Sequence, residues 1–265
     1  MNTIRRIALI ALTILIFIHT VKAQSNTQAD EYFKFAENYK SNSKIDSAVI
    51  YFEKAAKLYQ NDRNFDRAVN SFNQIGIILT RKDEYQKAKV FLNQALSIAV
   101  SNLDTGGLTI ATTYIALGVL YGAEENYEKS LFFHNKALNI RLLKLGKYHS
   151  DVATSYGNLG NIYLRNKEYD RSVQAHLEAM VIREKLFGKE SVEVNQTYIN
   201  LGNVYRAQKQ YKTALEYLQK ALTNKIKQLG PDHKDLAKLY VSISEIYYLM
   251  DNKEKGDLYK SKSHT

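Results

Sequence analysis

The sequence predicts an all-α protein in which pairs of helices stack into a solenoid, and three observations favour this fold class. The composition is that of a globular helical chain, because 45% of the 265 residues are hydrophobic, one is Pro and none is Cys. Short motifs recur at intervals of 42 residues, which is the signature of stacked repeats. Within each interval, apolar residues follow the i, i+3, i+4, i+7 spacing of one helix face.

The first 23 residues are expected to be a secretory signal peptide. Two arginines precede an apolar stretch over residues 7–18 that only Thr13 interrupts, and the small-x-small pattern that signal peptidase cleaves ends at Ala23. An uncleaved membrane anchor is the alternative, but the apolar stretch is shorter than the roughly 20 residues that span a bilayer. No later segment is apolar enough to span a membrane. We therefore expect a secreted or periplasmic protein that is cleaved after Ala23.

The charge favours an acidic partner. The chain has 37 basic and 27 acidic residues, a net charge of +10, and three basic residues leave with the signal peptide, so 34 − 27 gives +7. No basic cluster with interleaved aromatic residues is present, so a nucleic-acid partner is not expected. The absence of Cys excludes disulfides and thiol nucleophiles. The sequence contains no phosphate loop, calcium loop or catalytic triad pattern, so we expect no cofactor, no bound metal and no enzymatic activity.

The hexapeptide "NLGNIY" at residues 158–163 returns as "NLGNVY" at residues 200–205. The same interval reaches "QIGIIL", "ALGVLY" and "SISEIY", and an interval of 40 reaches "KFAENY". These motifs predict a repeat region over residues 24–265. Its six helix pairs are expected at residues 28–62, 66–101, 108–145, 150–187, 192–229 and 234–262.

Each repeat contains two helical stretches, and in the second to fifth repeats a glycine lies on the packing face of the first stretch. In the fourth repeat, the packing face of the first helix carries Leu159, Gly160 and Tyr163, and the second helix begins after a polar break, at Tyr169. Glycine has no Cβ, so it allows the two helices to approach closely. Small residues are expected to face this position from the second helices: Ala88, Ser130, Ser172 and Ala214.

These residues resemble the tetratricopeptide repeat (TPR) family, whose usual repeat is 34 residues long. The 42-residue interval, with "NLGNIY" and "LGPDHKDLAKLY", is similar to the kinesin light chain type of TPR over residues 103–250, and residues 28–102 resemble a more general TPR. The resemblance implies a right-handed α-solenoid whose first helices line a concave groove that binds peptides or partner proteins.

The extra residues of each repeat lengthen the second helix by about two turns, or roughly 12 Å. The lengthened helices are expected to end at left-handed C-cap glycines, Gly146, Gly188 and Gly230. The last repeat departs from the pattern, because Ser244 replaces the packing glycine and its second helix has Lys253, Gly256 and Lys260 at the packing positions, which we expect to be too polar for a buried face. A polar final helix suits the cap of a solenoid. A chain that continues beyond this sequence is the alternative.

A polar line along the first helices is the candidate binding surface. Asn158 and Asn161 lie on the face opposite the packing stripe, and Asn200 and Asn203 repeat them. An amide donates and accepts hydrogen bonds at once, which suits a peptide bond, and the TPR resemblance supports this role. The alternative is that these asparagines only keep a helix face solvated. The full set of candidate groove residues is Asn158, Asn161, Arg165, Asn200, Asn203, Arg206, Asn70 and Gln74.

The third repeat breaks this polar line, because it has Ala116 and Val119 where the fourth has asparagines. We expect a small apolar patch there that receives a side chain of the ligand.

Four of the six histidines fall into two pairs, each with a structural interpretation. His134 and His176 occupy the second-helix position of a core aromatic residue, so we expect packing rather than metal binding. His149 and His233 recur in the turns between repeats, where we expect them to act as turn or capping residues.

The sequence therefore predicts an exported, non-enzymatic scaffold that binds a protein or peptide. One alternative is the extracytoplasmic sensor region of a longer signalling protein, of the histidine kinase or transcriptional regulator type. A second is an enzyme, or a subunit of one, whose catalytic domain lies outside these residues. The sequence does not indicate an oligomeric state.

Overall fold

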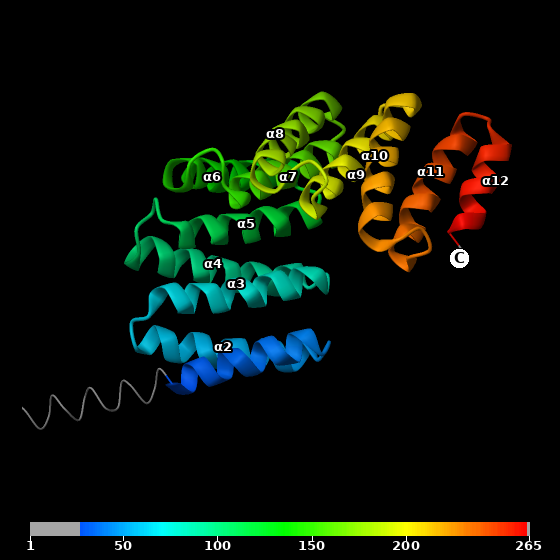
Figure 1. Ribbon diagram of the computed structural model, residues 1–265. Coiled ribbons are helices and arrows are strands. Elements are labelled where there is room, and N and C mark those ends of the chain that lie inside the picture. Colours follow the sequence, from blue (N-terminus) through cyan, green and yellow to red (C-terminus); the bar gives the residue numbers. More distant parts are fainter. Residues whose placement is uncertain (1–26, 264–265) are drawn as a thin grey trace, which may run out of the picture. The chain divides into compact units, whose positions relative to one another are not determined.

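The computed structural model describes residues 27–263 of the chain (Figure 1). The expected signal peptide lies outside these described residues. The described part is built of helices and short turns and contains no strand, so the all-α class and the solenoid of packed helix pairs are confirmed.

The helices follow one another with short connections. Residues 27–41 are helical, and the later elements are α2 (Ile45–Asn61), α3 (Phe65–Arg81), α4 (Tyr85–Asn102), α5 (Leu108–Ala123), α6 (Tyr127–Leu145), α7 (Ser150–Arg165), α8 (Tyr169–Phe187), α9 (Val192–Ala207), α10 (Tyr211–Leu229), η1 (Lys234–Leu236), α11 (Ala237–Leu249) and α12 (Lys253–Lys262). Consecutive helices such as α3 and α4, α7 and α8, and α9 and α10 pack against each other. The described chain forms two compact units, and the division falls between Asn126 and Tyr127. One continuous array over residues 24–265 stays a prediction.

The packing glycine has the role that the sequence predicts. A Cβ added to Gly160 would lie 2.7 Å from the imidazole of His176, closer than side chains normally approach. Ser172 faces Gly160 from α8, and its hydroxyl donates a hydrogen bond of 2.7 Å to the Gly160 carbonyl oxygen. The four small residues that were expected on the second helices are fully buried. The close approach of α7 and α8 therefore depends on Gly160.

The last helix pair has the same contact, but here the serine lies on the first helix and the glycine on the second. Ser244, on α11, donates a hydrogen bond of 2.7 Å to the carbonyl oxygen of Gly256, on α12. A Cβ added to Gly256 would lie 2.5 Å from the ring of Tyr248. The expectation that the packing positions of this helix are too polar to be buried is wrong for Gly256, which is buried against α11. Tyr259 also stacks on Tyr247, with 5.4 Å between the ring centroids.

The expected left-handed caps need a correction. Gly188 and Gly230 have positive φ values of 83° and 88°, but their ψ values are 159° and 160°. A left-handed helical residue has ψ near 47°. These angles belong to an extended region that only glycine populates readily. The chain therefore leaves each long helix in an extended direction.

The turns between repeats are capped as predicted. The Nδ1 atom of His149 accepts a hydrogen bond of 3.1 Å from the backbone N–H of Asp151, at the start of α7. His233 repeats this contact with Asp235, at 3.2 Å. Ser191 holds the equivalent position before α9, and its hydroxyl accepts from the N–H of Val194. Each side chain satisfies a backbone donor that the helix leaves free.

His134 and His176 lie in the core, as predicted for packing residues. Burial, together with a smaller contribution from Arg141 for His134 and from Arg183 for His176, lowers the pKa of each histidine to about 4. Neither ring nitrogen of His176 has a hydrogen-bond partner within the described residues. The imidazole of His176 therefore packs as a neutral, apolar group against Gly160.

Acid should destabilise the second unit through these two histidines. The unfolded chain binds a proton near pH 6.5, but the folded protein does so only near pH 4. Stability is therefore complete above pH 6.5 and falls as the pH drops toward 4, by about 2 kcal/mol per histidine between pH 6.5 and 5. Urea unfolding at pH 7 and pH 5 measures this loss. His176→Leu should remove about half of it, because Leu92 and Leu218 hold the equivalent positions. An identical pH dependence of the variant and the protein would contradict this assignment.

Candidate binding surface

The predicted groove residues lie on three helices in two units. Asn158, Asn161 and Arg165 are on α7, and Asn200, Asn203 and Arg206 are on α9, all in the second unit. Asn70 and Gln74 are on α3 in the first unit. Because α7 and α9 contact each other, the structure brings the two asparagine pairs onto neighbouring helices of one unit.

The four predicted asparagines of α7 and α9 are accessible to solvent, and three of them have no hydrogen-bond partner among the described residues. Asn161 is exposed, and Asn158, Asn200 and Asn203 are half-buried. Asn200 accepts a hydrogen bond of 3.1 Å from Gln196, which lies one turn earlier on the same face. Within residues 27–263 the side-chain amides of Asn158, Asn161 and Asn203 make no hydrogen bond. Their donors and acceptors are open to a ligand.

The two arginines near this surface already have partners. Arg206 forms an ion pair of 2.6 Å with Glu245, on α11. The guanidinium of Arg165 lies over the ring of Tyr127, 5.4 Å from its centroid. Exposed ion pairs contribute little to stability, so an acidic ligand can compete with Glu245 for Arg206 at small cost.

On the first unit, Asn70 lines a hollow of about 380 Å³ between α3 and α5. Leu108 and Thr112 of α5 line the same hollow, and Thr112 holds the position in its repeat that Asn70 holds in the preceding one. Gln74 accepts a hydrogen bond of 3.2 Å from Lys40. The expected apolar patch is reduced to Val119, because Ala116 is buried.

Sequence reasoning missed Asn73, which also lines this hollow. Its side chain is 1% exposed, and its amide nitrogen donates a hydrogen bond of 3.0 Å to the hydroxyl of Thr113. Its Oδ1 atom has no partner among the described residues. The sequence does mark Asn73 as unusual, because the equivalent residues in the third and fifth repeats are Ile115 and Ile199.

Sequence reasoning also missed Asn195, which lies in the core. Its side chain is 1% exposed, and neither amide atom has a hydrogen-bond partner in the part of the chain that the structure describes. The equivalent residues are Ala111 and Ala153, which are both buried. An unpaired buried amide is costly.

Asn195→Ala should therefore stabilise the protein by about 1–2 kcal/mol, because it removes two unpaired polar atoms at the cost of a small cavity. Thermal and urea unfolding measure the change. The reverse substitution, Ala153→Asn, is the matched control and should destabilise by a similar amount. A lower melting temperature for Asn195→Ala would show that its amide has a favourable contact.

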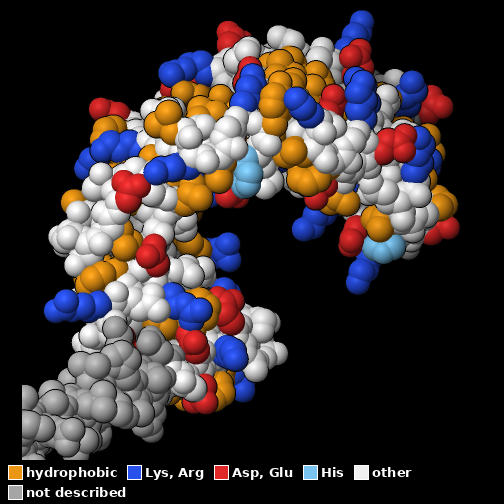
Figure 2. Space-filling model, turned by 60° about the vertical axis from the view of Figure 1, so that its left-hand side comes forward, with side chains coloured by type: hydrophobic (Ala, Val, Ile, Leu, Met, Phe, Trp, Pro, Cys, Tyr) orange, Lys and Arg blue, Asp and Glu red, His pale blue; other side chains and the backbone are white. Residues whose placement is uncertain are grey.

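The surface charge is mixed. On the face shown in Figure 2, Lys and Arg side chains lie among Asp and Glu side chains rather than in one block. Several are paired, such as Lys227 with Glu190 at 2.6 Å and Arg171 with Glu168 at 2.5 Å. Among the described residues, no helix is both long enough and apolar enough to cross a membrane.

Comparisons with known proteins agree on the fold. Family models described as tetratricopeptide repeat match residues 67–143, 151–227 and 193–255, and residues 29–62. A comparison with curated proteins gave no match. At these ranges the family models cover more than half of the chain.

Solved structures with the same fold share little sequence with this chain. BtubC (BKLC) from P. vanneervenii is 20% identical, with a TM-score of 0.63, and the match covers 92% of this chain and 88% of that one. A putative kinesin light chain from Podosopora anserina is 16% identical, with a TM-score of 0.67 and coverages of 76% and 94%. Aspartyl phosphate phosphatase F from Bacillus subtilis is 14% identical, with a TM-score of 0.66 and coverages of 97% and 74%.

Proposed function

The chain belongs to the tetratricopeptide repeat family, and on that premise we propose that it is an exported, non-enzymatic scaffold that binds an extended peptide or partner protein along α7 and α9. The fold is typical of protein–protein interaction and generally serves as a non-enzymatic scaffold. Both matching family models are described as tetratricopeptide repeat.

One observation carries this proposal. Asn158 and Asn161 of α7 hold the positions that Asn200 and Asn203 hold on the neighbouring helix α9, and the amides of all but Asn200 have no hydrogen-bond partner among the described residues. Asn is less favourable in a helix than Ala by several tenths of a kcal/mol. A solvated face could use Lys, Glu or Gln at no such cost. A row of amides that donate and accept is suited to the backbone of an extended segment.

The arginines give the proposed partner an acidic character. Arg165 and Arg206 lie on the same two helices as the asparagines, and the chain without its first 23 residues carries a net charge of 34 − 27 = +7. A carboxylate of the ligand would replace Glu245 at the guanidinium of Arg206, with the geometry that arginine and carboxylate prefer. The exchange requires Glu245 to return to solvent, where it is already half exposed.

Export is the second part of the proposal. The apolar stretch and the small-x-small site before Gln24 support a cleaved signal peptide, and retention by an uncleaved amino-terminal anchor is the alternative. N-terminal sequencing of the protein from culture medium or envelope fractions should give a chain that starts at Gln24. A chain that starts at Met1 in the membrane fraction would support the anchor instead.

The binding surface can be mapped once a partner is in hand. Pull-down from envelope extracts with the purified protein should recover a partner, which is then titrated in a hydrogen-exchange experiment. The proposal expects protection on α7 and α9, in the turns that contain Asn158 and Asn200. Protection confined to the second helices, α6, α8 and α10, would contradict it.

A further inference from the structure

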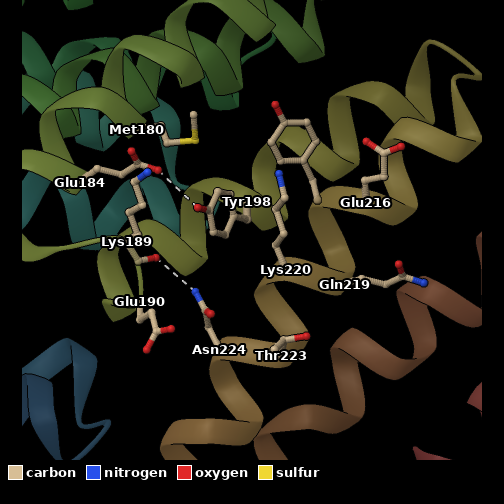
Figure 3. Close-up of a pocket in the computed structure, with 11 residues that line it drawn as sticks. Met180, Glu184, Lys189, Glu190, Tyr198, Glu216, Gln219, Lys220, Thr223 and Asn224 are labelled. Atoms are coloured by element: carbon tan, nitrogen blue, oxygen red, sulfur yellow. Dashed lines mark hydrogen bonds between the residues drawn. The ribbon is translucent and has the colours of Figure 1, made fainter.

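A hollow of about 790 Å³ opens between α8 and α10 (Figure 3). None of the four residues of the asparagine surface, Asn158, Asn161, Asn200 and Asn203, lines it. On α9, Tyr198 contributes to this hollow, and it lies about 200° around the helix from Asn200. The two sites therefore use opposite faces of α9. The lining residues combine carboxylates, lysines, amides and phenol rings: Met180, Glu184, Lys189, Glu190, Tyr198, Glu216, Tyr217, Gln219, Lys220, Thr223 and Asn224.

Glu184 departs from the repeat pattern at its position. The equivalent residues in the second, third and fifth repeats are apolar: Val100, Leu142 and Ile226. Leu142 packs against the core of the fourth repeat, and Ile226 packs against the core that α10 and α11 share. Packing therefore accepts an apolar side chain here, and the carboxylate of Glu184 is not required by the fold.

Asn224 departs in the same way from the opposite wall. Its equivalents are Ile98, Ile140 and Ile182, of which Ile98 and Ile182 are buried. Two neighbouring repeats have thus replaced an apolar residue with a polar one, and both replacements line the same hollow. A shared ligand explains why the two changes occur together.

The contacts of these residues leave hydrogen-bonding capacity toward the hollow. The Tyr198 hydroxyl donates to Oε1 of Glu184 over 3.3 Å, and the Asn224 amide donates to the carbonyl oxygen of Lys189 over 3.2 Å. Burial and the nearby Glu184 raise the pKa of Tyr198, so its hydroxyl remains a donor. Among the described residues, no cation lies within ion-pair distance of Glu184. A carboxylate can accept about four hydrogen bonds, so most of its capacity is unused.

The aromatic rings supply a flat surface beside this carboxylate. Tyr217 stacks on Tyr205, with 5.5 Å between centroids, and its ring lies 6.1 Å from that of Tyr198. Lys220 lies over Tyr217 at 5.2 Å from its centroid, which shows that this ring accepts a cation. Lys189 also lines the hollow but forms no ion pair with Glu184. Of the three lining carboxylates, Glu190 is already paired with Lys227, whereas Glu184 and Glu216 form no ion pair among the described residues.

We propose that this hollow binds the guanidinium group of an arginine side chain from a partner polypeptide. A guanidinium is planar and can stack on tyrosine while its N–H groups form a fork with the Glu184 carboxylate. The Oδ1 atom of Asn224 accepts a further N–H from the same group. The site is independent of the asparagine surface, so it stands or fails separately from the function proposed above.

The test uses blocked arginine, N-acetyl-arginine methylamide, as the probe in NMR titrations of the whole protein. Blocked arginine should cause saturable shifts of the backbone resonances of Tyr198 and Asn224, and blocked citrulline, which lacks the charge, should cause none. Glu184→Leu should weaken binding about tenfold or more without loss of the fold, because Leu142 occupies the equivalent position. Glu254→Leu, on the exposed first turn of α12, is the control of equal charge and should bind normally.

Lys189→Ala should strengthen binding, because it removes a positive charge from the lining of the hollow that repels the bound guanidinium. Equal binding of blocked citrulline, or unchanged binding by Glu184→Leu, would overturn the guanidinium assignment. Tighter binding of free arginine than of an arginine-containing tetrapeptide would overturn the polypeptide source. The asparagine variants should leave every one of these titrations unchanged.

Discussion

Gly160→Leu should prevent the second unit from folding cooperatively, whereas Gly157→Ala, three residues earlier on the same helix, should stabilise it. At Gly160 even a Cβ would lie 2.7 Å from the ring of His176, which is fully buried, so that ring would have to shift. A larger side chain must separate α7 from α8 and break the hydrogen bond from Ser172 to the Gly160 carbonyl. Overpacking of this kind costs more than about 3 kcal/mol when the neighbours cannot relax.

Gly157 provides the matched control because it is also buried in α7. A Cβ there would meet only the guanidinium of Arg183, at 3.7 Å, which is an ordinary contact. Replacing a mid-helix glycine by alanine gains up to about 1 kcal/mol. Circular dichroism melts and urea unfolding of the two variants measure the contrast. A normal melt for Gly160→Leu, or similar losses for both variants, would show that the helices do not meet at Gly160.

Much of this fold was predictable because its determinants are local and repeated. The recurrence of glycine, tyrosine and small residues predicted the contact between Gly160 and Ser172, and the turn histidines predicted the caps at His149 and His233. Both predictions are confirmed. A periodic pattern reports which residues share a helix face, and face sharing decides most of the packing within a helix pair.

Other features escaped because they depend on contacts between different repeats. The division after Asn126 depends on how the helix pairs contact one another, and no short motif records that. The ψ angles of Gly188 and Gly230 depend on where the next helix begins. The expectation that Gly256 lies on a polar face was wrong. This glycine is buried, and on the second helix of the last pair it makes the contact that Gly160 makes on the first helix of the fourth pair.

For the candidate site, the sequence predicted a shared face but not the state of each side chain. It placed Asn158 and Asn200 on equivalent faces, yet only the structure shows that Arg206 is paired with Glu245. Glu184 and Asn224 could have been found from the sequence, since each is polar where the neighbouring repeats are apolar. Glu184 and Asn224 are exceptions to the repeat pattern, whereas the predicted binding asparagines were recognised because they recur in it.

The combined replacement of Asn158, Asn161, Asn200 and Asn203 by Ala should abolish capture of the partner while leaving the fold intact. Each change removes a donor and an acceptor from the surface, and the loss of several hydrogen bonds to a peptide backbone, each about 0.5–1.5 kcal/mol, weakens binding by several orders of magnitude. Helicity should rise slightly, because Ala is the better helix former. The only hydrogen bond lost within the described protein is the one between Gln196 and Asn200.

A second variant controls for the loss of exposed amides in general. Asn135, Asn139 and Gln174 lie on α6 and α8, are exposed, and are outside both proposed sites. Their combined replacement by Ala should leave capture unchanged. A loss of capture by this control would mean that binding depends on the overall surface rather than on α7 and α9.

The most direct measurement is therefore quantitative pull-down from envelope extracts with the protein, the four-asparagine variant and the control variant, all shown to be folded by their melting curves. The proposed scaffold function predicts a partner that is recovered by the protein and by the control variant and is absent from the four-asparagine variant. Equal recovery of that partner by all three would contradict peptide binding through the asparagines of α7 and α9.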